Sequence, residues 1–205
     1  SALRGLLDQG DEALLTLQEQ HKISQDIPNR VRASLQESRA QARQLDVILE
    51  AEKQAGTQGL DDMEQRLQAA HAEIEQALDA LAQAREEEQP AVIYEIDEML
   101  KLTTPALDDI DHLLGLAASE RARAENVVER LHSTLSLAEE RWQGLQARGA
   151  TEPSITRALS SLRSEADEVG VMAQERTLRA YQQINERVTR LDASLEELSS
   201  QLEVL

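Results

Sequence analysis

Apolar residues recur along nearly the whole chain at alternating steps of three and four residues. Residues at this spacing share one face of an α-helix, and a long run of them forms the seam along which helices pack side by side. Leu and Ala fill most of these positions, Phe is absent, and only eight Gly interrupt a chain of 205 residues. No segment alternates with the period of two that a half-buried strand requires. The sequence therefore predicts an all-α fold of long helices packed into thin bundles.

Interruptions of the seam predict three helices in the first part of the chain. Asp26 can cap a helix, and Pro28 suits the first turn of the next one. Gly56 suits the position just after a helix end, and a third apolar seam starts at Leu60. Because short connections make neighbouring helices antiparallel, we expect an elongated antiparallel three-helix bundle over residues 1–88.

One more reversal is predicted in the second part of the chain. Gly149 can close a helix, Thr151 can cap the next one, and Pro153 can occupy its first turn. The seam then continues to Leu205, so we expect a single unbroken final helix. Residues 106–205 would thus form a long antiparallel helical hairpin, a coiled-coil second unit of the protein.

Two of the four prolines lie in the stretch EEEQPAVIYEIDEMLKLTTPALDD, residues 86–109. Three consecutive Glu residues oppose a helix C-terminus, so we expect the helix to pass through Pro90 with a kink. At Pro105 we expect a break or strong kink, since Thr104 suits an N-cap and Pro105 the first helical position. Residues 89–105 are therefore predicted to be a kinked helical joint between the two units.

Apolar residues in this joint cover more than one helix face. One interpretation is that both units bury them, because helices approach from more than one side. The other is an exposed groove in which another chain docks. The candidate joint or docking residues are Val92, Ile93, Ile96, Met99, Leu100 and Leu102.

The net charge of −18 disfavours binding to nucleic acid or to anionic lipid surfaces. Nearly half of this charge lies between residues 86 and 111. A solvated helix face is the favoured interpretation, ahead of a landing site for a basic partner or a weak Ca²⁺ or Mg²⁺ site, since DDIDH lacks the Gly-turned spacing of an EF-hand loop. The acidic patch consists of Glu86, Glu87, Glu88, Glu95, Asp97, Glu98, Asp108, Asp109 and Asp111.

No motif in the sequence predicts catalysis, a metal or a cofactor. The histidines (His21, His71, His112 and His132) never pair at the i, i+4 spacing of a helical zinc site, and Cys is absent. Gly-rich phosphate loops and GxSxG nucleophile elbows are absent too. Trp142 falls on a seam and is interpreted as a core residue. We therefore expect a protein that is not an enzyme.

The one basic cluster, RVRASLQESRAQAR, contains Arg30, Arg32, Arg39 and Arg43. It is interpreted as a source of helical ion pairs with Glu, with contact to anionic lipid as the alternative. No apolar run reaches the roughly 18 residues of a membrane span. Because the chain opens without Met and ends in mid-heptad, we expect part of a longer protein.

Three-helix units joined through a continuous helix resemble spectrin repeats, and among bacterial proteins the spectrin-like cytoplasmic region of the EzrA-type septation-ring regulators. The features that carry the resemblance are IPNRVRASLQ, AGTQGLDDMEQRL, the passage through residues 86–109, and Trp142 on a helix seam. The resemblance implies a membrane-tethered scaffold that contacts cell-division or cytoskeletal proteins. The expected final helix departs from the family's pattern, because a helix of that length needs a third partner.

The function predicted from these observations is non-enzymatic scaffolding through helix faces. Candidate partners are other proteins, further repeats of the same chain, and a second copy as a homodimer. One alternative is an extracytoplasmic sensor bundle of the chemoreceptor type, which binds a small molecule between helices. A membrane-remodelling hairpin is a third reading, and the negative charge disfavours it.

Small-angle scattering tests the predicted elongation. Residues 60–149 at about 1.5 Å each give a particle of about 130 Å or longer. A maximum dimension below about 80 Å would contradict this architecture.

Overall fold

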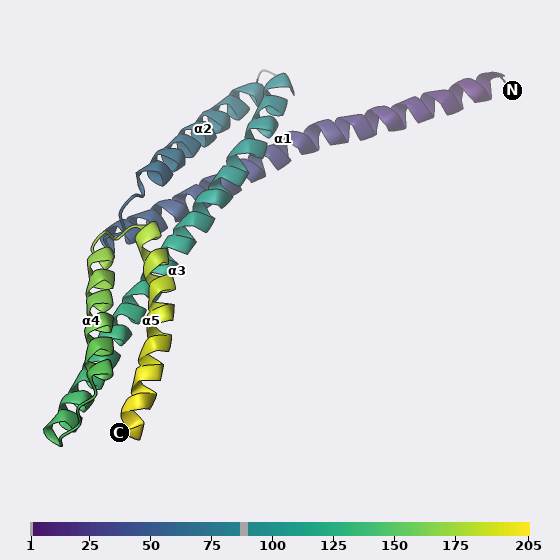
Figure 1. The fold of residues 1–205 in the computed structure, drawn as a ribbon. Coiled ribbons are helices and arrows are strands. Elements are labelled where there is room, and N and C mark those ends of the chain that lie inside the picture. The colour runs from purple at the N-terminus through teal and green to yellow at the C-terminus, as the bar shows by residue number, and fades with distance from the viewer. Residues whose placement is uncertain (1, 87–89) are drawn as a thin grey trace. The chain divides into compact units, whose positions relative to one another are not determined.

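The computed structural model describes the backbone of residues 2–86 and 90–205, and the side chains of residues 26–84 and 91–205. It contains helices α1 (Ala2–Gln54), α2 (Asp61–Glu86), α3 (Pro90–Ala147), α4 (Pro153–Ala173) and α5 (Leu178–Val204) (Figure 1). The described residues form no strand, only an isolated bridge between Gln58 and Thr177. The predicted all-α fold class is confirmed.

The chain divides into two compact units. Unit 1 comprises Ser1–Val47 and Asp62–Asp111, and unit 2 comprises Ile48–Asp61 and His112–Leu205. Each unit therefore combines segments that are separated in the sequence, and α3 contributes to both. The expected division into residues 1–88, 89–105 and 106–205 follows chain order and does not coincide with these units.

Unit 1 is built from α1, α2 and the first part of α3. Arg39 Nε on α1 lies 2.7 Å from Glu75 Oε1 on α2, and Thr103 on α3 donates a 3.0 Å hydrogen bond to Glu73 on α2. The core residues follow the apolar seams that the sequence predicts. Those with an exposed fraction of 1% or less are Val31, Leu35, Ala42, Leu45, Leu67, Ile74, Leu107 and Ile110.

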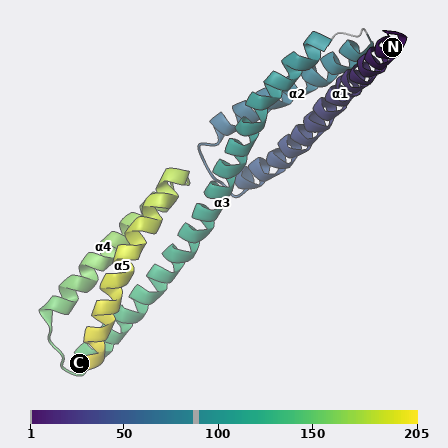
Figure 2. The ribbon, with the colours of Figure 1, turned by 90° about the vertical axis from the view of Figure 1, so that its right-hand side faces the viewer.

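Unit 2 is a second three-helix arrangement, in which α4 and α5 run antiparallel beside the later part of α3 (Figures 1 and 2). Arg163 on α4 and Glu139 on α3 form a 2.8 Å ion pair, and the Trp142 indole donates a 3.2 Å hydrogen bond to Thr156. Trp142 is buried, as its seam position predicts. The core includes Leu131, Leu135, Ala138, Leu159, Ala166, Val169, Ile184, Val188, Leu195 and Leu202.

The prediction of one unbroken final helix is wrong, because the chain reverses at residues 174–177. Arg176 takes the left-handed conformation, with φ of 52°. Thr177 then caps α5 by accepting a 3.1 Å hydrogen bond from the Ala180 amide. The reversal lets two helices cover the apolar face of α3, so the chain itself supplies the third helix.

The expected helix boundary at Pro28 is also wrong, and so is a break at Pro105; a strong kink at Pro105, the other expectation there, stays a prediction. Pro28 lies inside α1 and Pro105 inside α3. A proline inside a helix removes one backbone hydrogen bond and costs about 3 kcal/mol or more. Buried Val31 follows Pro28, and buried Thr103 and Leu107 flank Pro105. Packing of these neighbours offsets the local cost, so both helices continue.

The prediction that a helix passes through Pro90 with a kink is wrong. α2 and the start of α3 run antiparallel, because Glu73 meets Thr103 and Arg66 meets Asp109, so no single helix passes through this proline. The connecting residues 87–89 lie outside the described residues. The length of about 130 Å expected from residues 60–149 assumed that single helix, so it loses this basis. A proline at the first helical position sacrifices no intrahelical bond and has a suitable φ. At the later reversal Pro153 occupies the first turn as predicted, whereas the N-cap is Glu152 and not Thr151.

No helix in the described part of the chain combines the length and apolar character needed to cross a bilayer.

A matched pair of leucines on α3 tests the core of unit 2. Leu135 is 0% exposed and Leu137 is 63% exposed. Leu135→Ala is expected to lower the free energy of unfolding by about 3 kcal/mol, because it leaves a cavity. Leu137→Ala is expected to change it by less than about 0.5 kcal/mol. Urea unfolding of the two variants measures the difference, and equal losses would contradict the helix orientation.

Candidate functional site

The predicted joint or docking residues lie in unit 1 and divide between two sides of α3. Ile93, Ile96 and Leu100 are buried, with exposed fractions of 8%, 5% and 6%. Val92 and Met99 are half-buried. Leu102 is 77% exposed. The six residues therefore do not form one surface, and Leu102 alone of them is strongly exposed.

Tyr94, which the sequence prediction missed, shares the exposed side of α3 with Leu102. Its side chain is 59% exposed. Tyr94, Glu98 and Leu102 follow one another at steps of four residues, so they occupy successive turns on one helix face. We call these three residues the outer face of α3. The signal for Tyr94 was its position, one residue outside the buried seam at Ile93.

The carboxylates of the acidic patch whose side chains are described do not gather around a cation site. The side chains of Glu86, Glu87 and Glu88 lie outside the described residues. Asp97 and Glu98 pair with Lys101 at 3.4 and 2.5 Å. Glu95, Asp108, Asp109 and Asp111 are exposed; Asp108 accepts a hydrogen bond from Gln41, and Asp109 pairs with Arg66.

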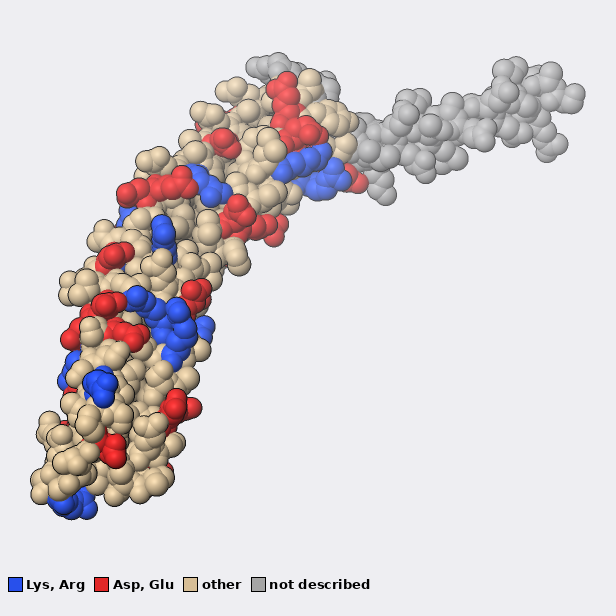
Figure 3. All heavy atoms as spheres, in the orientation of Figure 1, with Lys and Arg blue, Asp and Glu red and all other residues tan. Residues whose placement is uncertain are grey.

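Asp97 and Glu98 are thus paired within α3, whereas Asp108 and Asp109 contact residues of α1 and α2. The hydrogen bond to Glu98 raises the pKa of Lys101 above its usual value. No group of three potential metal ligands converges among the described residues. On the face shown in Figure 3, acidic and basic side chains intermingle over the described residues.

Of the basic cluster, Arg39 bridges to Glu75 on α2, so its ion pair joins two helices and is not the expected pair within α1. Arg30, Arg32 and Arg43 are exposed. The helices of unit 1 also meet through His71, whose Nε2 lies 2.7 Å from Asp46 Oδ2.

Unit 2 contains a buried polar cluster that the sequence prediction missed, formed by Glu52, Thr57, Arg121 and Tyr181. Glu52 is 5% exposed, Thr57 6% and Tyr181 3%. Arg121 donates to both oxygens of Glu52, at 3.2 and 3.0 Å, and Thr57 donates at 2.8 Å. We call these four residues the polar junction. A lone arginine at a seam position, Arg121, was its one signal in the sequence.

The electrostatics of the polar junction suit a structural ion pair. The hydrogen bond from Arg121 holds the pKa of Glu52 below its usual range, although burial opposes this shift. The same contact raises the pKa of Arg121. Burial raises the pKa of the Tyr181 phenol. A general acid needs a carboxyl with a raised pKa, and Glu52 has the opposite shift.

Beside the polar junction, two turns of unit 2 contact each other directly. The Gln58 amide donates a 2.7 Å hydrogen bond to the Arg176 carbonyl. Gly56 has φ of 85°, and a Cβ built there would lie 2.0 Å from Arg176 Nη1. The left-handed φ favours glycine at position 56, and a Cβ there would require the flexible end of the Arg176 side chain to move. The connection between α1 and α2 is thereby joined to the turn between α4 and α5.

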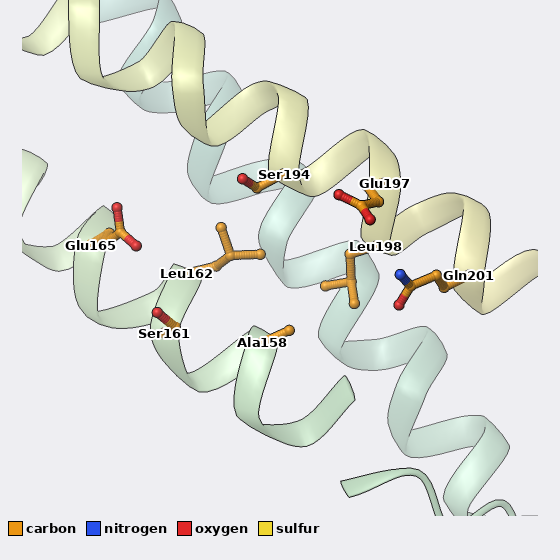
Figure 4. Close-up of a pocket in the computed structure, with 8 residues that line it drawn as sticks. All are labelled: Ala158, Ser161, Leu162, Glu165, Ser194, Glu197, Leu198 and Gln201. Atoms are coloured by element: carbon orange, nitrogen blue, oxygen red, sulfur yellow. The ribbon is translucent and has the colours of Figure 1, made fainter. Parts of the chain in front are cut away.

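An open groove runs along the surface of unit 2 between α4 and α5. Its floor is formed by Leu162 and Leu198, which are 6% and 3% exposed. Figure 4 shows these two side chains projecting into the space between the helices, with Glu165 on one side and Glu197 on the other. We call this surface the α4–α5 groove; its remaining lining residues are Ala158, Ser161, Ser194 and Gln201.

Comparison with models of known families, with curated proteins and with solved structures finds no match for this chain.

Arg121→Ala tests the polar junction. It leaves the Glu52 carboxylate buried without its cation, so we expect a loss of about 3 kcal/mol in the free energy of unfolding at neutral pH. Arg123→Ala, at an exposed arginine on the same helix, is expected to cost less than about 0.5 kcal/mol. Chemical denaturation of both variants measures the two losses.

Arg121→Ala also tests how the free energy of unfolding depends on pH. Because the folded pKa of Glu52 is lowered, the unfolded chain binds more protons in acid, and stability falls as the pH drops. The contribution is complete above the usual pKa of 4.5 and is lost as the pH falls through the folded value. Between pH 3 and 7, the free energy of unfolding should therefore depend less steeply on pH for Arg121→Ala than for the unchanged protein. An identical pH dependence of the two proteins would contradict the assignment of a lowered pKa to Glu52.

Proposed function

We propose that this chain is a non-enzymatic scaffolding module that binds other proteins through exposed helix faces. The observation that carries the proposal is the outer face of α3. Tyr94 and Leu102 are exposed by 59% and 77%, two turns apart on one helix. An aromatic and an aliphatic side chain with a carboxylate between them match the composition of protein interfaces, in which apolar anchors lie among polar neighbours.

The interior chemistry supports binding over catalysis. The polar junction holds an ionised Glu52 against Arg121, and both side chains are occupied by each other and by Thr57. A catalytic carboxylate must instead reach a substrate and exchange a proton near the working pH. The surface is therefore the functional part of the molecule in this proposal.

The use of α3 by two units supports the spectrin-like interpretation. α3 supplies Leu107 and Ile110 to unit 1 and Leu131 and Leu135 to unit 2, all with exposed fractions of 1% or less. In the proposed role, the chain belongs to a cytoplasmic, membrane-tethered scaffold for cell-division or cytoskeletal proteins. Other proteins are the proposed partners of its exposed faces.

The proposal is tested by paired surface variants. The purified chain is used as bait under chemical crosslinking, and each recovered protein is then purified and titrated against it. Tyr94→Ser/Leu102→Ser is expected to abolish binding of a direct partner with the fold intact by circular dichroism. The control, Leu137→Ser/Val171→Ser, removes two side chains that are each 63% exposed, and it should bind normally.

Two outcomes contradict the proposal. One is that no purified protein binds the chain directly, whichever variant is used. The other is that small-molecule screening by thermal unfolding finds a compound that raises Tm by several degrees. That result favours the sensor alternative.

A further inference from the structure

The α4–α5 groove carries acidic side chains on both walls. Glu165 lies on α4 and Glu197 on α5, and Figure 4 shows them on opposite sides of the two floor leucines. The groove continues past Glu197 to Glu152 at the start of α4. None of the residues that line either part is Lys or Arg. The walls therefore present carboxylates with no cation in the lining itself.

Other helix contacts in unit 2 pair opposite charges. Arg163 meets Glu139 at 2.8 Å between α4 and α3, and Arg130 pairs with Asp192 between α3 and α5. Beyond the groove, α4 and α5 are themselves bridged by Glu168 and Arg187 at 2.9 Å. Like charges on facing helices repel each other. In the groove, unlike in the rest of the α4–α5 contact, no lining residue neutralises the carboxylates. A cationic side chain of another molecule would therefore stabilise them.

The shape of the groove suits a helix. Ala158, Ser161 and Ser194 are short, so they leave room above the leucine floor between the longer side chains of the lining. A neighbouring helix can insert its own ridge of side chains into such a groove. The lining residues on α4 run from Glu152 to Glu165, which at 1.5 Å per residue is about 20 Å.

We propose that the α4–α5 groove binds a basic amphipathic helix of a partner protein. Leu or Ala side chains of that helix pack over Leu162 and Leu198, and Lys or Arg side chains on either side pair with Glu165 and Glu197. A second copy of the groove is a poor occupant, because it would place carboxylates against carboxylates on a chain of net charge −18. This inference rests on the proposed function and gives its partner a chemical class.

The test uses a designed helical peptide of about 18 residues, with Leu and Ala along one face and Lys beside that face. Fluorescence anisotropy measures its binding to the whole chain. Glu165→Gln/Glu197→Gln should weaken binding about tenfold, as the loss of two exposed ion pairs predicts. The matched control is Glu129→Gln/Glu140→Gln, which removes two exposed carboxylates from α3 and should leave affinity within about twofold.

A second pair of measurements separates docking from general attraction to an acidic protein. Ala158→Leu fills the groove without changing the charge and should weaken binding. A peptide with its Leu residues replaced by Ser should also bind more weakly. The groove assignment would be overturned if the unchanged chain, the Gln pair in the groove and Ala158→Leu bound the peptide with equal affinity. It would also be overturned if both peptides bound the unchanged chain equally well.

Failure of the groove assignment can be distinguished from failure of the proposed function. If a purified natural partner loses binding with Tyr94→Ser/Leu102→Ser but not with Ala158→Leu or the Gln pair in the groove, the scaffolding function stands and the groove assignment fails. If no purified protein binds through any surface, the proposed function itself fails.

Discussion

Burial of the apolar side of α3 is the constraint on which the rest of the structure depends. The helix spans Pro90–Ala147 and contributes core residues to both units. Leu107, Ile110 and Leu135 are 0% exposed. One helix cannot cover its own apolar stripe, so each unit must bring two further helices to it. In unit 1 these are α1 and α2, and in unit 2 they are α4 and α5.

This constraint explains why the seams were predictable and several helix boundaries were not. Core residues repeat at intervals of three and four wherever a helix packs, so Leu35, Ile74 and Ile184 are evident in the sequence. A proline contributes only a local cost, and packing over many turns outweighs it at Pro28 and Pro105. The opposite error occurred at residues 174–177, where a reversal forms at Arg176 without Gly or Pro.

That reversal left one signal in the apolar pattern. The continuous seam runs to Ala173 and resumes at Ile184, and in the interval Ala180 and Tyr181 are adjacent and both buried. Neighbouring buried residues need contacts on more than one side of a helix, as Ile184 and Asn185 on the same helix also do. Thr177, which caps α5, completes the pattern. Neither feature is decisive without the positions of α3 and the connection at residues 55–60.

The polar junction was beyond sequence prediction for a different reason. Arg121 and Glu52 are 69 residues apart, and nothing local indicates that they meet. The same holds for Asn185, which is buried on α5 and donates a 3.3 Å hydrogen bond to the Glu120 carbonyl on α3. Polar groups buried in apolar seams can fix the register of packed helices, because a shifted register leaves them unpaired.

Fixed register has a consequence for recognition. Once the seams and buried polar pairs set how each helix is turned, they also determine which residues face outward. Tyr94 and Leu102 are exposed because Ile93, Ile96 and Leu100 occupy the core side of the same helix. In the same way, Leu162 and Leu198 at the floor of the α4–α5 groove leave Glu165 and Glu197 on its walls. In this protein, the interactions that stabilise each unit also define the surfaces that a partner can contact.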